Sequence, residues 1–256
     1  MREFTIILFL LLSIKLFACD CEEKTLLQKI QNCDFIAVGK VLKISPDVYN
    51  RDYHNIQIEL INVFKGQHVT SLKILSKSNS SCSFFTPENS TWLIFASFDM
   101  NNILSFGQCS GSREIDRKFV SQKYPYADSN YKKTISLKME ILEFMKINNI
   151  QSTNPYDLEI SYCQNCWKAL KGFNNQNKFA VYEATINSDL SINKLIPLKE
   201  FSNHKLKTKL FDCIKNNLVI YNNNNTILPI QSKLILVYYF YPADKKYPSF
   251  ISIYDL

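Results

Sequence analysis

The first strand of the predicted fold is Asp34-Phe35-Ile36-Ala37-Val38-Gly39-Lys40-Val41, part of an apolar run that continues to Ile44. Four more runs of this kind follow, at 56–64, 71–75, 91–98 and 103–108, with polar residues between them. Val, Ile, Phe and Trp suit pleated, half-buried strands, and short strands separated by polar turns are typical of closed sheets. Five such strands in close succession predict a mostly β fold that begins with a small barrel.

Apolar residues at helical spacing flank these strands on both sides. Residues 22–32 place Leu26, Leu27 and Ile30 on one helical face, with two acids in the first turn. Residues 131–148 repeat the pattern and end at Asn148-Asn149, a typical helix stop. We therefore expect a short helix before the barrel and a longer helix after it, packed on the barrel.

A second domain follows a predicted linker. Residues 150–157 contain Ser152-Thr153-Asn154-Pro155, which is typical of a linker. We therefore divide the chain beyond residue 18 into a barrel domain, 19–149, and a small α+β domain, 158–256. The second domain is expected to contain a hairpin, a helix and a strand at 178–198, 203–217 and 234–241. This order is similar to the C-terminal domain of TonB-type envelope proteins, which implies a fold and no function.

The N-terminus has the plan of a signal peptide covering residues 1–18. Arg2 precedes the apolar run 6–12, and the small residue Ala18 stands directly before Cys19. No later segment reaches the length of apolar sequence that a membrane-spanning helix needs. The sequence thus predicts a protein that begins at Cys19, has no transmembrane span, and is secreted or located in the cell envelope.

All eight cysteines lie after residue 18. In an oxidising compartment an even number of cysteines indicates disulfides, although spacing alone does not fix their connectivity. They are Cys19, Cys21, Cys33, Cys82, Cys109, Cys163, Cys166 and Cys213.

Charge and motifs argue against two broad classes of function. The formal net charge of +7 comes from scattered lysines, whereas nucleic-acid binding requires a basic stripe. The three histidines are isolated, and the five glycines form no phosphate-binding loop. We therefore expect no nucleic-acid partner, no enzyme activity, no cofactor and no resident metal.

The order of cysteines and strands resembles the N-terminal domain of the tissue inhibitors of metalloproteinases, the netrin-like module, and its shorter bacterial relatives. The resemblance covers roughly residues 19 to 115 and implies a five-stranded OB-type barrel with flanking helices. It is carried by Cys19-Asp20-Cys21, the strand that begins at Asp34, Val63-Phe64-Lys65-Gly66, Cys82, Trp92-Leu93-Ile94-Phe95-Ala96 and Cys109.

The resemblance implies disulfides Cys19–Cys82 and Cys21–Cys109. The cysteine that Cys33 matches has its usual partner shortly after the family domain, and this chain lacks that partner. The set Cys33, Cys163, Cys166 and Cys213 is therefore left with its pairing open, and one bond among these residues would join the two domains.

The resemblance also implies a function as an inhibitor of zinc endopeptidases. In the family, the α-amine and carbonyl oxygen of the first cysteine chelate the open position of a catalytic zinc, and the next side chain enters the specificity pocket. Here these roles fall to Cys19 and Asp20. A carboxylate loses its hydration in an apolar pocket at a cost of several kcal/mol unless it meets a cation, so inhibition of peptidases with deep apolar pockets should be weak.

Two alternatives stay open. Leu16-Phe17-Ala18-Cys19 also approximates a lipoprotein-processing site, and a lipid anchor at Cys19 would make the chain an envelope-anchored interaction module without inhibitory activity. Lipidation would leave an odd number of cysteines, which favours ordinary secretion. Cys163-Gln164-Asn165-Cys166 has the spacing of zinc and redox sites, so a thiol–disulfide enzyme is the third possibility, but a disulfide is the preferred interpretation.

Overall fold

The computed structural model describes residues 19–162, 164–229 and 231–254, so the predicted signal peptide lies outside the described residues. The chain divides into two compact units. The first consists of residues 34–116 and the N-terminal segment up to Glu23. The second consists of residues 24–33 and 117–256.

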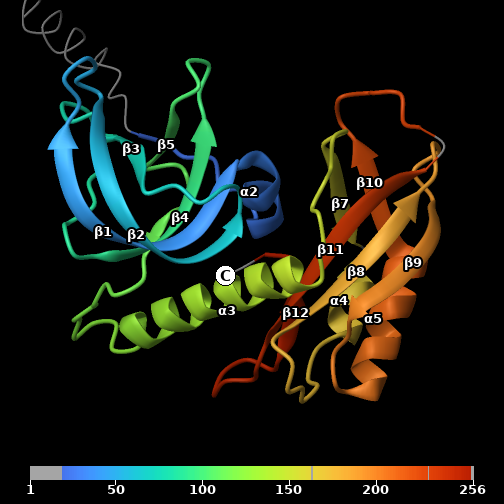
Figure 1. Cartoon of the computed structure of the whole chain (residues 1–256). Coiled ribbons are helices and arrows are strands. Elements are labelled where there is room, and N and C mark those ends of the chain that lie inside the picture. Colours follow the sequence, from blue (N-terminus) through green and yellow to red (C-terminus); the bar gives the residue numbers. More distant parts are fainter. Residues whose placement is uncertain (1–18, 163, 230, 255–256) are drawn as a thin grey trace, which may run out of the picture. The chain divides into compact units, whose positions relative to one another are not determined.

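The first unit is a closed β-barrel (Figure 1). Its sheet has the order β1-β2-β3-β5-β4-β6, and a further pairing of β1 with β4 closes the barrel. Neighbouring strands are antiparallel except β3 and β5, which are parallel. This is an OB-type topology and confirms the predicted fold class. The strands are β1 (Phe35–Pro46), β2 (Tyr53–Lys65), β3 (Ser71–Leu75), β4 (Thr91–Phe98), β5 (Leu104–Gly107) and β6 (Arg113–Glu114).

The barrel interior is filled by alternate side chains of these strands, as the two-residue period of a strand requires. A ring cluster formed by Phe84, Trp92 and Phe106 packs edge to face at one side of the core. The indole N–H of Trp92 donates to Ser90 Oγ at 2.8 Å, so its polar atom is paired. The buried core is Phe35, Ala37, Val41, Ile56, Ile58, Leu72, Ile74, Trp92, Ile94, Ala96 and Phe106.

The second unit is an α+β structure built on a four-stranded antiparallel sheet of order β12-β11-β8-β9. A separate two-stranded sheet pairs β10 with β7. The strands are β7 (Leu158–Tyr162), β8 (Phe179–Ile186), β9 (Ile192–Lys199), β10 (Leu218–Asn222), β11 (Ser232–Tyr241) and β12 (Phe250–Ser252). The helices are α2 (Leu26–Asn32), α3 (Ala127–Ile147), α4 (Gln164–Ala169) and α5 (His204–Asn217). Within the described ranges, no helix combines the length and apolar content needed to cross a bilayer.

Helices cover both faces of the four-stranded sheet. Helix α5 contributes buried Leu206 and Leu210 to the cluster that includes Tyr182 of β8. Phe179 points to the opposite face because side chains alternate along a strand. There its ring lies 5.7 Å from that of Phe144 on α3. Helix α3 therefore packs on the second unit, whereas the sequence assigns it to the barrel domain.

The start of α2 differs from the sequence-based prediction, which begins the helix at residue 22. Thr25 is the N-cap: its Oγ accepts from the N–H of Gln28 at 3.3 Å, and its own N–H donates to Gln28 Oε1 at 2.8 Å. This capping box provides hydrogen-bond partners for two backbone N–H groups that have none within the helix, so the helix begins at Leu26. Glu22 and Glu23 lie before the helix, and the expected acidic first turn is absent from α2.

Candidate functional site

The candidate site is the N-terminal segment Cys19-Asp20-Cys21. The structure joins Cys19 to Cys82 and Cys21 to Cys109, the two pairs that the resemblance implies. The Cα atoms are 5.0 Å apart in the first pair and 5.2 Å apart in the second, within the usual range for disulfides. Both ends of the three-residue segment are thus bonded to the barrel.

The loop between β3 and β4 positions Cys82. Its Phe84 side chain enters the ring cluster of the barrel core, and the Phe84 N–H donates to the Ser76 carbonyl oxygen at 2.9 Å. The Cys82 N–H donates to Ser80 Oγ at 3.1 Å. An aromatic anchor two residues away therefore fixes the backbone that carries the Cys82 sulfur.

Ser76 ties the same loop to the turn between β1 and β2. Its hydroxyl donates to the carbonyl oxygen of Asp52 at 3.0 Å and lies 2.8 Å from His54 Nδ1. Ser76 is fully buried, so these bonds hold the start of the Cys82 loop.

Two serines position Cys109, which follows β5. Ser110 Oγ donates to the Gly107 carbonyl oxygen at 2.8 Å and lies 2.9 Å from Ser112 Oγ. Buried Ser112 accepts from the N–H of Phe95 on β4 at 2.8 Å. Cys109 therefore lies in a short segment that hydrogen bonds attach to the end of β5 and to β4.

The two disulfides lie next to each other. The sulfur atoms of Cys19, Cys21 and Cys109 are all within 4.8 Å of one another. A thiolate is the form of cysteine that binds metal, and these sulfurs are oxidised, so the cluster acts as a covalent clamp rather than as a metal-ligating set. We call residues 19–21 with Cys82 and Cys109 the cysteine clamp.

The clamp presents an acidic edge to solvent. Asp20 is exposed between the two half-buried cysteines, and Glu22 and Glu23 that follow it are also exposed. Three carboxyl groups in four residues make this edge complementary to a cationic surface. Asp20 stands between two crosslinked neighbours, which restricts the directions that its side chain can take.

The four cysteines with open pairing fall into three groups. Cys166 of α4 is bonded to Cys213 of α5, with Cα atoms 5.9 Å apart, and both residues are buried in the core of the second unit. Cys33 is buried as well. Cys163 lies outside the described residues. The sulfur of Cys166 thus forms a disulfide that joins α4 to α5, and its partner is not the other cysteine of the Cys163–Cys166 motif.

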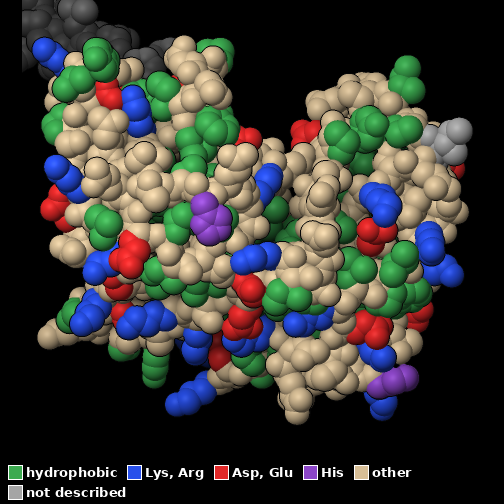
Figure 2. All heavy atoms as spheres, in the orientation of Figure 1, with side chains coloured by type: hydrophobic (Ala, Val, Ile, Leu, Met, Phe, Trp, Pro, Cys, Tyr) green, Lys and Arg blue, Asp and Glu red, His purple; other side chains and the backbone are tan. Residues whose placement is uncertain are grey.

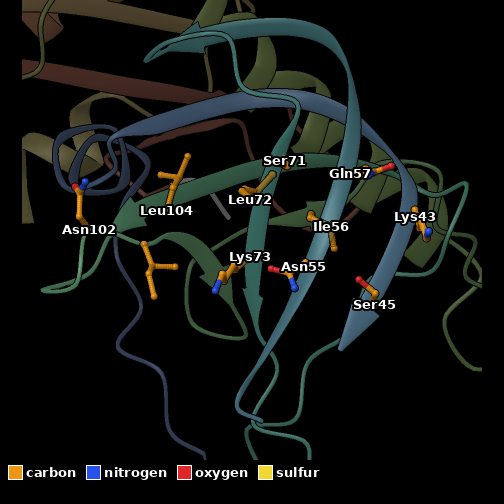
Figure 3. Close-up of a pocket in the computed structure, with 11 residues that line it drawn as sticks. Lys43, Ser45, Asn55, Ile56, Gln57, Ser71, Leu72, Lys73, Asn102 and Leu104 are labelled. Carbon is orange, nitrogen blue, oxygen red and sulfur yellow. The ribbon is translucent and has the colours of Figure 1, made fainter. Parts of the chain in front are cut away.

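A groove that was not predicted from the sequence lies on the outside of the barrel. Strands β1, β2 and β3 and the turn after β4 line a volume of about 440 Å³ (Figure 3). A signal for it is present in the sequence, because alternate residues of these strands are polar. They are Lys43, Ser45, Asn55, Gln57, Ser71 and Lys73.

No protein-family model and no curated protein matches this chain. The likeness to the tissue inhibitors of metalloproteinases stays a prediction based on the cysteines and strands, and so does the likeness to TonB-type domains.

Proposed function

We propose that the protein acts as an inhibitor of zinc endopeptidases through its cysteine clamp, with Cys19 as the first residue of the mature chain. The observation that carries this proposal is the attachment of Cys19-Asp20-Cys21 to the barrel by two adjacent disulfides. The proposal places the protein outside the cytoplasm, since disulfides persist in oxidising compartments.

Rigidity makes such a segment suitable for binding in an active-site cleft. A flexible N-terminus would lose conformational freedom on binding, at a cost of about 0.5–1.5 kcal/mol for each ordered side chain. The clamp removes much of that freedom before binding, because both cysteines are crosslinked to anchored parts of the barrel. The folded protein therefore offers a short, preorganised stretch of backbone.

The chemistry of the first residue supplies the zinc ligand. A catalytic zinc holds one position open for water or substrate. Once cleavage frees the α-amine of Cys19, its nitrogen lone pair and the Cys19 carbonyl oxygen form a five-membered chelate with that metal. The sulfur of Cys19 takes no part, since it is bonded to Cys82.

Asp20 sets the selectivity of this proposal. In the bound state its side chain enters the specificity pocket, where a carboxylate needs a cationic partner to offset the loss of hydration. We therefore infer that the target is a zinc endopeptidase whose specificity pocket carries a lysine or an arginine. Glu22 and Glu23 add to the attraction of a basic cleft.

A lipid anchor is the alternative use of Cys19. A thioether to lipid and the Cys19–Cys82 disulfide need the same sulfur, and acylation of the amine would also remove the zinc ligand. The intact mass of the protein from its native host separates these states. Acyl chains add several hundred daltons, whereas each disulfide removes only about two.

The direct test is titration of the purified protein, beginning at Cys19, against zinc endopeptidases with basic and with apolar specificity pockets. We expect inhibition of at least one peptidase of the basic class and weaker inhibition of the apolar class. Absence of inhibition across the panel, with the free α-amine verified by N-terminal sequencing, would contradict the proposal.

A further inference from the structure

A polar groove lies on the outer face of strands β1, β2 and β3. The polar side chains that line it on these strands point away from the barrel core, whereas Ile56 and Leu72, which also border the groove, have their side chains buried in the core. The turn between β4 and β5 and the first residue of β5 contribute Asn102, Ile103 and Leu104. Figure 3 shows Asn102 and Leu104 at one side of the groove. The groove belongs to the barrel alone and shares no residue with the cysteine clamp.

Cross-strand pairing arranges six polar side chains in two rows. In the first row Lys43 pairs with Gln57, which pairs with Ser71. In the second row Ser45 pairs with Asn55, which pairs with Lys73. Each row thus contains one amine, one amide and one hydroxyl, and Figure 3 shows Asn55 beside Lys73.

Most of these groups are not used by the protein itself. Within the described part of the chain, the side chains of Lys43, Asn55 and Gln57 make no hydrogen bond or ion pair. Lys73 differs, because its Nζ lies 2.5 Å from Asp47 Oδ2 and its charge is compensated. The lining residues include no carboxylate, so Lys43 is the one uncompensated charge among them.

We propose that this groove binds a short oligosaccharide that contains a uronic acid. Amides both donate and accept hydrogen bonds, as sugar hydroxyls do, and the ammonium group of Lys43 complements one carboxylate. Strands lie about 4.8 Å apart, so a row across three strands spans about 10 Å, which suits a di- or trisaccharide laid along it.

The composition of the groove favours a saccharide over a nucleic acid. Single-stranded nucleic acids are held by aromatic side chains that stack on bases and by several cations along the backbone. No aromatic residue lines this groove, and only one of its two lysines is uncompensated. In OB-type barrels the face of the second and third strands binds oligonucleotides as well as oligosaccharides, so the choice between them rests on the side chains that line the groove. The inference does not depend on the proposed inhibitory function.

Calorimetric titration of the protein with uronic-acid trisaccharides tests the proposal. Galacturonate, guluronate and mannuronate oligomers are each compared with their methyl esters, which keep the hydroxyls and remove the charge. We expect at least one acid to bind, and its ester to bind about tenfold more weakly because the contact with Lys43 is lost. No binding by any of the acids would overturn the proposal, and so would equally tight binding of a polyglutamate of matched charge.

Substitutions in the groove locate the site. We expect Lys43→Gln to weaken binding of the acid about tenfold and to leave the ester unchanged, and Gln57→Ala to weaken both about tenfold. Lys77→Gln is the control, because Lys77 is an exposed lysine of the same barrel outside the groove. Equal affinities of all three variants and the unmodified protein would place the ligand elsewhere and refute the assignment. Circular dichroism verifies that each variant is folded.

Discussion

At the scale of single residues, Asp47 shows how one carboxylate stabilises the barrel. The hydrogen bond from Lys73, with further bonds from the amides of Tyr49 and Asn50, lowers the pKa of Asp47 from 3.8 to about 2. The side chain is almost completely buried at the start of the turn between β1 and β2. The Asp47 carboxylate thus accepts hydrogen bonds from the turn after β1 and also forms an ion pair with Lys73 at the edge of the groove.

This pKa predicts how the stability of the barrel depends on pH. The ionised form is favoured in the folded state, so its contribution is complete above the ordinary value of 3.8 and is lost as the pH falls towards 2. We expect Asp47→Asn to lower the urea midpoint at neutral pH and to flatten its decline between pH 4 and pH 2. Glu59→Gln, at an exposed position on β2, serves as the control. Parallel pH profiles for Asp47→Asn and the unmodified protein would contradict this account.

Asp20 carries the selectivity of the proposed inhibitor. Replacement of Asp20 by leucine removes a carboxylate that an apolar pocket cannot solvate. We expect Asp20→Leu to inhibit peptidases with apolar pockets at least about tenfold more strongly, and peptidases with basic pockets about tenfold more weakly. Inhibition constants measured on both classes check this, and an unchanged ratio between them would show that Asp20 does not enter the pocket.

At the scale of elements, Gly66 fixes the way in which β2 ends beside the start of β1. It has a φ of +90°, and a Cβ atom built on it would lie 2.5 Å from the carbonyl oxygen of Asp34. The next closest atoms belong to Phe35, a core residue of the barrel. Any side chain at this position would force the two strands apart.

We expect Gly66→Ala to destabilise the barrel by about 2 kcal/mol or more, because strained backbone and a steric clash act together. Gly39→Ala is the matched control in β1, where the added Cβ would make contacts of 3.4 Å or longer. Urea denaturation followed by the fluorescence of buried Trp92, with the second tryptophan removed by Trp167→Phe in both variants and the reference, measures the effect. A loss of stability in Gly66→Ala no larger than that in Gly39→Ala would be inconsistent with the clash.

The elements that the sequence predicts correctly have a strong periodic signal. The five barrel strands, the hairpin β8–β9, helix α5 and strand β11 are in this group. The elements that were not predicted, β6, β7, α4, β10 and β12, have two to six residues, and segments of this length carry a weak periodic signal. The equally short β3 and β5 were predicted because they lie within a series of strands separated by polar turns. Closure of the barrel through β1 and β4 depends on contacts between residues far apart in the chain, which local patterns do not encode.

The candidate sites differ in how much of them can be read from the sequence. The cysteine clamp is visible in the spacing of the cysteines once the resemblance is considered. The groove on β1–β3 is not, because it depends on the register that brings Lys43 beside Gln57 and Asn55 beside Lys73. Register follows from turns and core packing, so alternating polar residues indicate an outer face without showing which of them meet.

The disulfides of the protein serve two separate purposes. Two of them attach the N-terminal segment to the barrel, and Cys166–Cys213 joins two helices in the second unit. Charged side chains of both signs are interspersed on the face shown in Figure 2. The specific features of this chain are therefore the clamp and the groove rather than its overall charge.

Removing one disulfide at a time distinguishes the bonds that are needed for inhibition from the bond that stabilises the second unit. We expect the double variant Cys21→Ala, Cys109→Ala to keep the free α-amine of Cys19 but to inhibit about tenfold more weakly, because the N-terminal segment regains conformational freedom. The matched control is Cys166→Ala, Cys213→Ala, which should destabilise the second unit by about 2–4 kcal/mol and leave the inhibition constant unchanged. Equal inhibition by both double variants would mean that the clamp has no role in binding.

In the proposed complex the α-amine of Cys19 coordinates the zinc of the peptidase. The most direct measurement compares the inhibition constant of the protein that begins at Cys19 with that of the same protein after selective acetylation of this amine. Acetylation leaves the barrel, both disulfides and Asp20 in place and removes only the nitrogen lone pair. We expect acetylation to raise the inhibition constant at least about 100-fold. Equal inhibition by the two forms would show that the amine does not bind the zinc.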